Sequence, residues 1–129
     1  MNYLLDTHCF IWFSEDDNQL PASVKAVIED PQHTIHLSIV SLWEMAIKVS
    51  LNKLKLSQSL EGITTKIDQS RIQWLSLMPR HIYQLRNLPF HHRDPFDRTI
   101  IAQGLVEHFT IITIDSIFSD YGVLTQWKV

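Results

Sequence analysis

Short apolar runs alternate along the chain with longer segments of helical periodicity. The apolar or β-branched runs predict strands at residues 3–5, 34–38, 72–77 and 111–114. Apolar residues recurring three or four positions apart predict helices at residues 21–29, 41–49, 60–70, 80–87 and from about 95 to 108, with a helical turn at 10–13. Because strands alternate with helices and no tight hairpin signal occurs, we expect an α/β fold with a parallel sheet covered by helices on both faces.

The composition agrees with one compact domain over residues 1–129. Hydrophobic residues make up 45% of the chain, which is enough for an apolar core. The single cysteine, Cys9, excludes an internal disulfide and a cysteine-rich zinc site. No apolar run reaches the length of a membrane span, and the first residues lack the pattern of a signal peptide. We therefore expect a cytoplasmic protein without membrane contact.

The formal net charge of −3 conceals an uneven distribution. Residues 1–44 contain seven acidic residues and one basic residue, whereas residues 45–93 contain eight basic and two acidic residues. The basic segment is typical of solvated helix faces, and it is also compatible with a nucleic-acid partner. The sequence alone leaves both interpretations open.

Acidic residues stand where a parallel sheet would present a ligand site. Asp6 and Asp115 follow predicted strands, and Glu44 and Asp97 lie near the starts of predicted helices. Two bare carboxylates about 4 Å apart repel each other by roughly 4 kcal/mol at an effective dielectric constant of 20. A cluster of four such groups therefore favours a bound divalent cation, and all-oxygen ligands suit Mg²⁺ or Mn²⁺.

Helix capping is the alternative explanation for some of these acids. Ser41 and Glu44 have the spacing of a capping box, and Asp94 and Asp97 have a similar arrangement around a proline. Asp6 is harder to explain in this way, because an acid directly after a buried strand is costly to desolvate without a partner or cavity. The same holds for Asp115.

Four ordered segments resemble the PIN-domain family. They are YLLDTH at residues 3–8, SLWEMAIK at 41–48, HHRDPFDR at 91–98 with IAQ at 101–103, and ITID at 112–115. The segments span nearly the whole chain, and four motifs in the same order are a specific signal. Within the family, the chain most resembles the VapC-type ribonuclease toxins of prokaryotic toxin–antitoxin pairs, particularly the group with this third motif.

The resemblance implies a three-layer α/β/α fold with a central parallel sheet and metal-dependent hydrolysis of RNA. It implies Mg²⁺ or Mn²⁺ as cofactor, an antitoxin protein as partner, and a homodimer. By motif, the catalytic metal-binding carboxylates correspond to Asp6, Glu44, Asp97 and Asp115. Asp94 corresponds to an additional acid of the subgroup with a less defined role.

Basic residues beside these acids are candidates for holding RNA phosphates. They are Lys48, His92, Arg93 and Arg98, and offsetting the acidic charge is their alternative role. The pair His8 and Cys9 suggests a nucleophile and base, but packing is the more ordinary role for a lone cysteine. The remaining histidines lack the spacing of a zinc site, and the tryptophans favour core or interface positions over base stacking.

Two other functional classes fit parts of this pattern. A non-catalytic PIN-like module would bind RNA or protein through the basic segment without cutting it. A phosphatase that begins with Asp on its first strand needs a second Asp two residues later, where this chain has His8. The intact set of acids favours the metal-dependent endoribonuclease over both.

Overall fold

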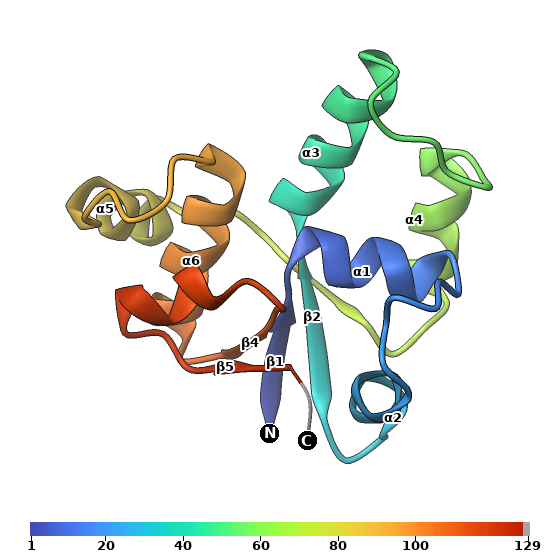
Figure 1. The fold of residues 1–129 in the computed structure, drawn as a ribbon, viewed down its shortest axis with the longest axis horizontal. Coiled ribbons are helices and arrows are strands. Elements are labelled where there is room, and N and C mark those ends of the chain that lie inside the picture. The colour runs from blue at the N-terminus through green and yellow to red at the C-terminus, as the bar shows by residue number, and fades with distance from the viewer. Residues whose placement is uncertain (128–129) are drawn as a thin grey trace.

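The computed structural model describes residues 1–127 and contains a five-stranded sheet in the order β3-β2-β1-β4-β5, with every neighbouring pair parallel. This is the three-layer α/β/α architecture expected from the sequence, with a central parallel sheet (Figure 1). The strands are β1 (Asn2–Leu5), β2 (Thr34–Ser38), β3 (Gln73–Leu75), β4 (Thr110–Ile112) and β5 (Thr125–Gln126).

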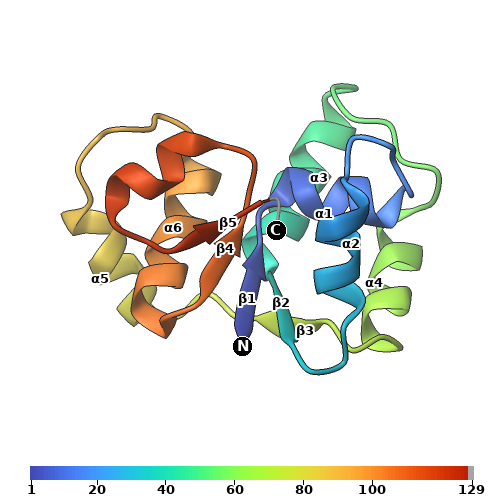
Figure 2. The ribbon, with the colours of Figure 1, turned by 60° about the horizontal axis from the view of Figure 1, so that its bottom comes forward.

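Helices fill the connections between the strands and lie on both sides of the sheet (Figure 2). One side carries helices from the first half of the chain: α1 (Thr7–Ser14), α2 (Ala22–Glu29), α3 (Ile39–Ser50) and α4 (Leu60–Asp68). The other side carries α5 (Pro79–Asn87), α6 (Pro95–Glu107) and the 3₁₀ helix η1 (Ser116–Tyr121). In addition, α3 contacts α6.

Successive residues of the central strands serve two separate apolar cores, because side chains of a strand point alternately to opposite faces. Leu5 and Ile112 pack with α1, α2, α3 and α4. Leu4 and Ile111 pack with α6 and η1 on the other face. All four side chains are at most 1% exposed. This burial explains why β1 and β4 have continuous apolar sequences rather than an alternation of apolar and polar residues.

Several element boundaries differ from those expected. The helix expected from residue 41 begins at Ile39, and the helical turn expected at 10–13 is the full helix α1. The strand expected at 72–77 has only three residues, and the one expected to run to residue 114 ends at Ile112. β5 and η1 were not expected, because a two-residue strand and a single 3₁₀ segment leave no periodic signal.

Among the described residues, no helix combines the length and apolar character that a membrane crossing requires.

Candidate metal centre

Asp6 lies directly after β1 and is the N-cap of α1. Its Oδ1 accepts a hydrogen bond of 2.7 Å from the backbone N–H of Cys9, and its Oδ2 accepts one of 2.5 Å from the hydroxyl of Thr113. Burial raises the pKa of Asp6 above its ordinary value, although both hydrogen bonds oppose this rise. Since each oxygen has a fixed donor, the orientation of the carboxylate is set by the protein.

Thr113 connects Asp6 to Asp115. While its hydroxyl donates to Asp6, the same oxygen accepts a 3.1 Å hydrogen bond from the backbone N–H of Asp115. Asp115 then begins η1, where its Oδ1 accepts from the N–H of Ile117 at 2.9 Å. Sequence analysis missed Thr113. The signal that identifies it is a hydroxyl at the end of the strand beside β1, where a buried carboxylate needs a donor.

Glu44 lies in the second turn of α3, and its side chain is 1% exposed. Its Oε2 accepts a 2.6 Å hydrogen bond from Nζ of Lys48, one helical turn later. Its Oε1 is buried and has no hydrogen-bond partner among the described residues. A buried carboxylate oxygen without a donor is energetically costly, so this atom indicates a missing positive ligand.

The capping-box interpretation of Ser41 and Glu44 is wrong. Ser38 caps α3 instead, because its hydroxyl oxygen accepts from the backbone N–H of Val40 at 3.1 Å. The Ser41 hydroxyl is buried and forms a 2.9 Å hydrogen bond with the hydroxyl of Thr7. With the helix already capped, the carboxylate of Glu44 is not needed at the helix terminus.

Asp94 is the N-cap of α6, as its position before Pro95 predicts. Its Oδ1 accepts from the backbone N–H groups of Phe96 and Asp97 at 2.8 and 3.2 Å. The N–H of Asp94 donates to Nδ1 of His92 at 3.1 Å, so Asp97 does not close a reciprocal capping box. The carboxylate of Asp97 is therefore available for the cluster.

The five acids act on one another electrostatically. Burial, followed by the negative charges of the four other acids, raises the pKa of Asp97 from 3.8 to about 8. Those four are Asp94, Glu44, Asp6 and Asp115. The charges of the four other acids thus all reach Asp97, but of the five only Asp97 and Asp115 have carboxylate oxygens at the spacing of a shared ion, together with His92. The role of Asp6, Glu44, Asp94, Asp97 and Asp115 as metal ligands stays a prediction.

His92 lies between two of these carboxylates. Its Nε2 is 3.1 Å from Oδ2 of Asp97 and 3.2 Å from Oδ2 of Asp115. Together these residues offer one ligand atom each within 4.8 Å of one another, the group among the described residues with the spacing to hold a metal ion. His92 therefore lies inside the acidic site rather than beside it.

The residues present fit a divalent cation. The unpaired Oε1 of Glu44 and the mutual repulsion felt by Asp97 are both relieved by positive charge at this site. Most of the possible ligand atoms are carboxylate oxygens, which suit Mg²⁺ or Mn²⁺.

Lys48 supplies part of the compensating charge. Burial alone would lower the pKa of Lys48, but the hydrogen bond to Glu44 and the charges of Glu44, Asp94 and Asp97 raise it. Lys48 therefore remains a cation at the edge of the acidic site. One third of its side chain stays exposed beside the ion pair with Glu44.

The side chain of Arg98 makes its hydrogen bonds within the protein. Its guanidinium donates to the carbonyl oxygens of Pro89 and Leu88 at 2.6 and 3.4 Å and packs over the ring of Phe90. Only 7% of Arg98 is exposed. This position favours a structural role for Arg98 in holding the loop before α6. Arg93, in contrast, is exposed.

An apolar groove of about 560 Å³ adjoins the acidic site. Trp43 precedes Glu44 and packs edge-on against Phe96, which precedes Asp97. Trp43 is 58% exposed and Phe90 is 83% exposed. Ile82 and Leu85 of α5 line the same groove. An exposed apolar surface of this kind is typical of a protein interface.

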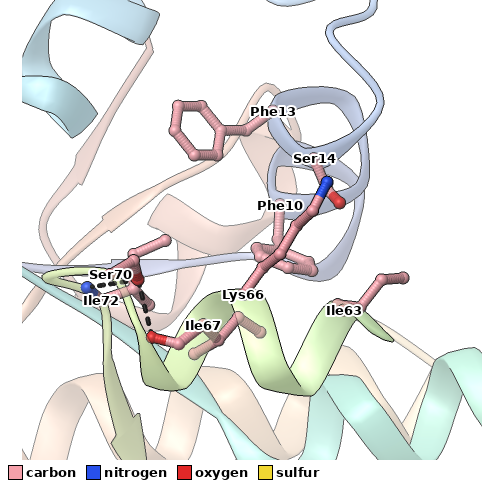
Figure 3. A pocket seen from close by; sticks show the side chains of 8 residues that line it. All are labelled: Phe10, Phe13, Ser14, Ile63, Lys66, Ile67, Ser70 and Ile72. Carbon is pink, nitrogen blue, oxygen red and sulfur yellow. Dashed lines mark hydrogen bonds between the residues drawn. The ribbon is translucent and has the colours of Figure 1, made fainter. Parts of the chain in front are cut away.

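A smaller hollow of about 190 Å³ lies between α1 and α4, away from the acids (Figure 3). Its walls are mainly apolar, with Phe10 and Phe13 from α1 and Ile67 from α4. No acidic residue lines it, and the hydroxyl of Ser70 is occupied by the carbonyl of Ile67. This hollow is therefore separate from the acidic site.

The remaining histidines and the cysteine have ordinary structural roles. Cys9 is fully buried, and burial raises the pKa of its thiol, so the nucleophile interpretation of His8 and Cys9 is wrong. His33 packs edge-on against Tyr3, and His36 stacks on Phe109. These contacts agree with the absence of zinc-site spacing in the sequence.

An α/β fold with a central parallel sheet and a carboxylate cluster at the strand ends defines the class of this protein. The chain belongs to the PIN domain family, whose model matches residues 3–124. The resemblance drawn from the four motifs is therefore confirmed. No curated protein matches the sequence.

Solved structures with this fold include VapBC and FitAcB structures. VapBC2 from Rickettsia felis, bound to a DNA fragment from their promoter, has a TM-score of 0.71 at 20% identity, covering 99% of this chain and 100% of that chain. VapBC-1 from nontypeable Haemophilus influenzae has a TM-score of 0.69 at 18% identity, covering 98% and 97%. FitAcB from Neisseria gonorrhoeae has a TM-score of 0.66 at 20% identity, covering 95% of each chain. At this identity the similarity shows the shared fold.

Proposed function

We propose that this PIN domain is a Mg²⁺- or Mn²⁺-dependent endoribonuclease that acts as the toxin of a toxin–antitoxin pair. The observation that carries the proposal is the buried Oε1 of Glu44, which has no hydrogen-bond partner among the described residues and lies in a site where acidic charges raise the pKa of Asp97. Such an arrangement is stabilised by a hard divalent ion. When bound, the ion would activate water and stabilise the developing charge on a phosphodiester.

In this proposal the carboxylates of Asp6, Glu44, Asp97 and Asp115 hold the ion, and Asp94 contributes mainly by capping α6. Asp6 is oriented by Thr113 and by the N–H of Cys9 before any ion binds. Such preorganisation lowers the cost of assembling the site.

RNA phosphates would contact the cations at the edge of the site. Arg93 is exposed, and Lys48 is partly exposed beside Glu44. His92 lies among the acids, and Arg98 is committed to the loop carbonyls, so these two contribute less directly. Arg93→Ala is the sharper test of phosphate binding, because this substitution removes no ion pair seen in the described residues.

The proposal is tested with purified protein and a structured RNA. Cleavage is expected with Mg²⁺ or Mn²⁺ and should stop with EDTA. Asp6→Asn and Asp97→Asn should each remove cleavage, whereas Asp120→Asn, which changes an exposed acid in η1, should retain it. Metal-independent cleavage, or full activity in Asp6→Asn, would contradict the proposal. RNA binding without any product would favour the non-catalytic module.

We further propose an antitoxin partner and a homodimer. The chain shares its fold with VapBC2, VapBC-1 and FitAcB, and the apolar groove at Trp43, Ile82 and Phe90 offers a surface for protein contact. Expression of the chain in the cytoplasm of a bacterial host should arrest growth, and co-expression of the neighbouring short reading frame should relieve the arrest. Growth arrest by the Asp97→Asn variant would contradict the proposal that the chain is a nuclease toxin.

A further inference from the structure

His92 holds the position between two carboxylates that a cation would be expected to take. Its Nε2 is 3.1 Å from Asp97 Oδ2 and 3.2 Å from Asp115 Oδ2, and the side chain is only 17% exposed. Neither of these two carboxylate oxygens has another hydrogen-bond donor among the described residues. The ring therefore supplies a hydrogen-bond donor to two carboxylate oxygens that otherwise have none among the described residues.

The hydrogen bond at the opposite ring nitrogen fixes the role of Nε2. Nδ1 accepts a 3.1 Å hydrogen bond from the backbone N–H of Asp94, so Nδ1 carries no proton in this arrangement. The proton of the ring is therefore on Nε2, which donates it toward Asp97 and Asp115. To bind a metal ion, Nε2 needs a free lone pair, so the proton would have to move to Nδ1. There it would clash with the backbone N–H hydrogen of Asp94, and the hydrogen bond between them would be lost.

The loop that carries His92 is held by contacts that do not involve the ring. Arg98 donates to the carbonyls of Leu88 and Pro89, and the backbone N–H of His92 donates to the hydroxyl of Tyr121 at 2.7 Å. The imidazole can therefore turn away while the backbone stays in place. What is lost is the bond from the Asp94 N–H and the two carboxylate contacts.

We propose that His92 is a displaceable occupant of the metal centre, whose imidazole donates to Asp97 and Asp115 in the metal-free protein and must withdraw before a divalent ion binds them. This inference rests on the metal site of the proposed function. The contacts of the ring with the two carboxylates stabilise the metal-free form only. Because ion binding breaks these contacts, they make the free energy of ion binding less favourable. His92 thereby sets the ion concentration at which the centre fills.

The test compares Mn²⁺ binding to the wild-type chain, His92→Ala and His91→Ala by isothermal titration calorimetry. His91 is the matched control, because it is the adjacent exposed histidine and its ring packs on Tyr121. We expect His92→Ala to bind Mn²⁺ about tenfold more tightly, in line with the strength of hydrogen bonds to charged groups. His91→Ala should bind as the wild type does. Weaker binding by His92→Ala would make the imidazole a ligand, and unchanged binding would remove any competition; either result overturns the inference.

Thermal unfolding provides a second measurement on the same proteins. In EDTA, His92→Ala should melt below the wild type, because Oδ2 of Asp97 and Oδ2 of Asp115 lose their hydrogen-bond donor. The increase in melting temperature on adding Mn²⁺ should be larger for His92→Ala than for the wild type. An equal increase in both would contradict displacement.

The wild-type protein supplies a test that does not depend on a variant folding. Long-range ¹⁵N–¹H spectra of the His92 ring should show the Nε2–H tautomer in EDTA and a change toward the tautomer mixture of a free imidazole with saturating Mg²⁺. A ring signature unaffected by Mg²⁺ at saturation would refute displacement. If neither the wild type nor His92→Ala binds Mn²⁺ or Mg²⁺, the metal centre of the proposed function fails. If the wild type binds and His92→Ala binds no more tightly, only the present inference fails.

Discussion

At the scale of single residues, the acids of this site are held in the fold at a cost in stability that depends on pH. Asp97, with a pKa of about 8, keeps in the folded state a proton that the unfolded chain releases near pH 4. Between these values the unfolded state binds fewer protons than the folded state. The free energy of unfolding of the metal-free protein therefore falls as pH rises from about 4 to about 8.

Replacing Asp97 by Asn should remove this fall, because the amide stays neutral at every pH. In EDTA at pH 8, we expect Asp97→Asn to be more stable than the wild type by about 1–2 kcal/mol, since the relief of repulsion exceeds the lost contact with His92. At pH 5 the difference should shrink. Urea unfolding at pH 5 and pH 8 measures the difference in the free energy of unfolding, with Asp120→Asn as the control variant. A stability gap that does not change with pH would contradict the argument.

Thr113 has a role that rests on its hydroxyl rather than its shape. Thr113→Val keeps the volume but leaves Oδ2 of Asp6 without a donor and the N–H of Asp115 without an acceptor. We expect a loss of about 1–3 kcal/mol in the free energy of unfolding. Thr110→Val changes a buried threonine of β4, three residues before Thr113, whose hydroxyl makes no hydrogen bond among the described residues, and it should be nearly neutral. Equal losses in the two variants would show that Thr113 matters only for packing.

At the scale of elements, the sequence predicted the helices and apolar strands because their periodicity reflects which face is buried. It placed the start of α3 at Ser41 because Ser38 and Ser41 are both suitable caps, and tertiary hydrogen bonding decides between them. The acids were predicted to converge because parallel strands end at one edge of the sheet. The position of the His92 ring between the acids was not predicted. It depends on the loop before α6, which is held by hydrogen bonds to the side chains of Arg98 and Tyr121.

The packing of α6 on β4 depends on the absence of a side chain at Gly104. A Cβ at this position would lie 2.8 Å from Cδ1 of Ile111 and 3.2 Å from Cγ2 of Val123, and both of these residues are buried. Helix propensity alone would favour alanine over glycine by about 1 kcal/mol, whereas overpacking a core costs about 1–3 kcal/mol. We therefore expect Gly104→Ala to lower the free energy of unfolding by about 1 kcal/mol, or the melting temperature by about 4 °C.

Gly62→Ala is the matched control for this steric argument. Gly62 lies in the first turn of α4, and its added Cβ would meet only the Ser59 and Gln58 side chains, the nearest at 3.2 Å. This substitution should be neutral or stabilising. Thermal unfolding of both variants measures the difference. A Gly104→Ala variant as stable as Gly62→Ala would contradict the close-packing argument.

At the scale of the whole molecule, the sheet order makes the site and the apolar groove neighbours. β1 pairs with β4, which places Asp6 near Asp115 although they are far apart in the chain. Glu44 on α3 and Asp97 on α6 complete the cluster, and the residues just before them, Trp43 and Phe96, line the groove. A protein docked in the groove would therefore also border the metal centre.

This arrangement leads to a test of the homodimer that leaves the metal centre intact. Ile82 is 44% exposed on α5 and lines the groove, whose lining includes none of the acids of the site. Placing a charge there should prevent apolar association, because burying an unpaired carboxylate at an interface is costly. We expect light scattering after size exclusion to give twice the chain mass for the wild type and the mass of one chain for Ile82→Glu. Leu124→Glu, at an exposed leucine next to β5, should remain dimeric. Both variants should bind Mn²⁺ as the wild type does. A dimeric Ile82→Glu would place the contact between copies on another surface, whereas loss of Mn²⁺ binding together with dimerisation would mean that the second copy helps to build the centre.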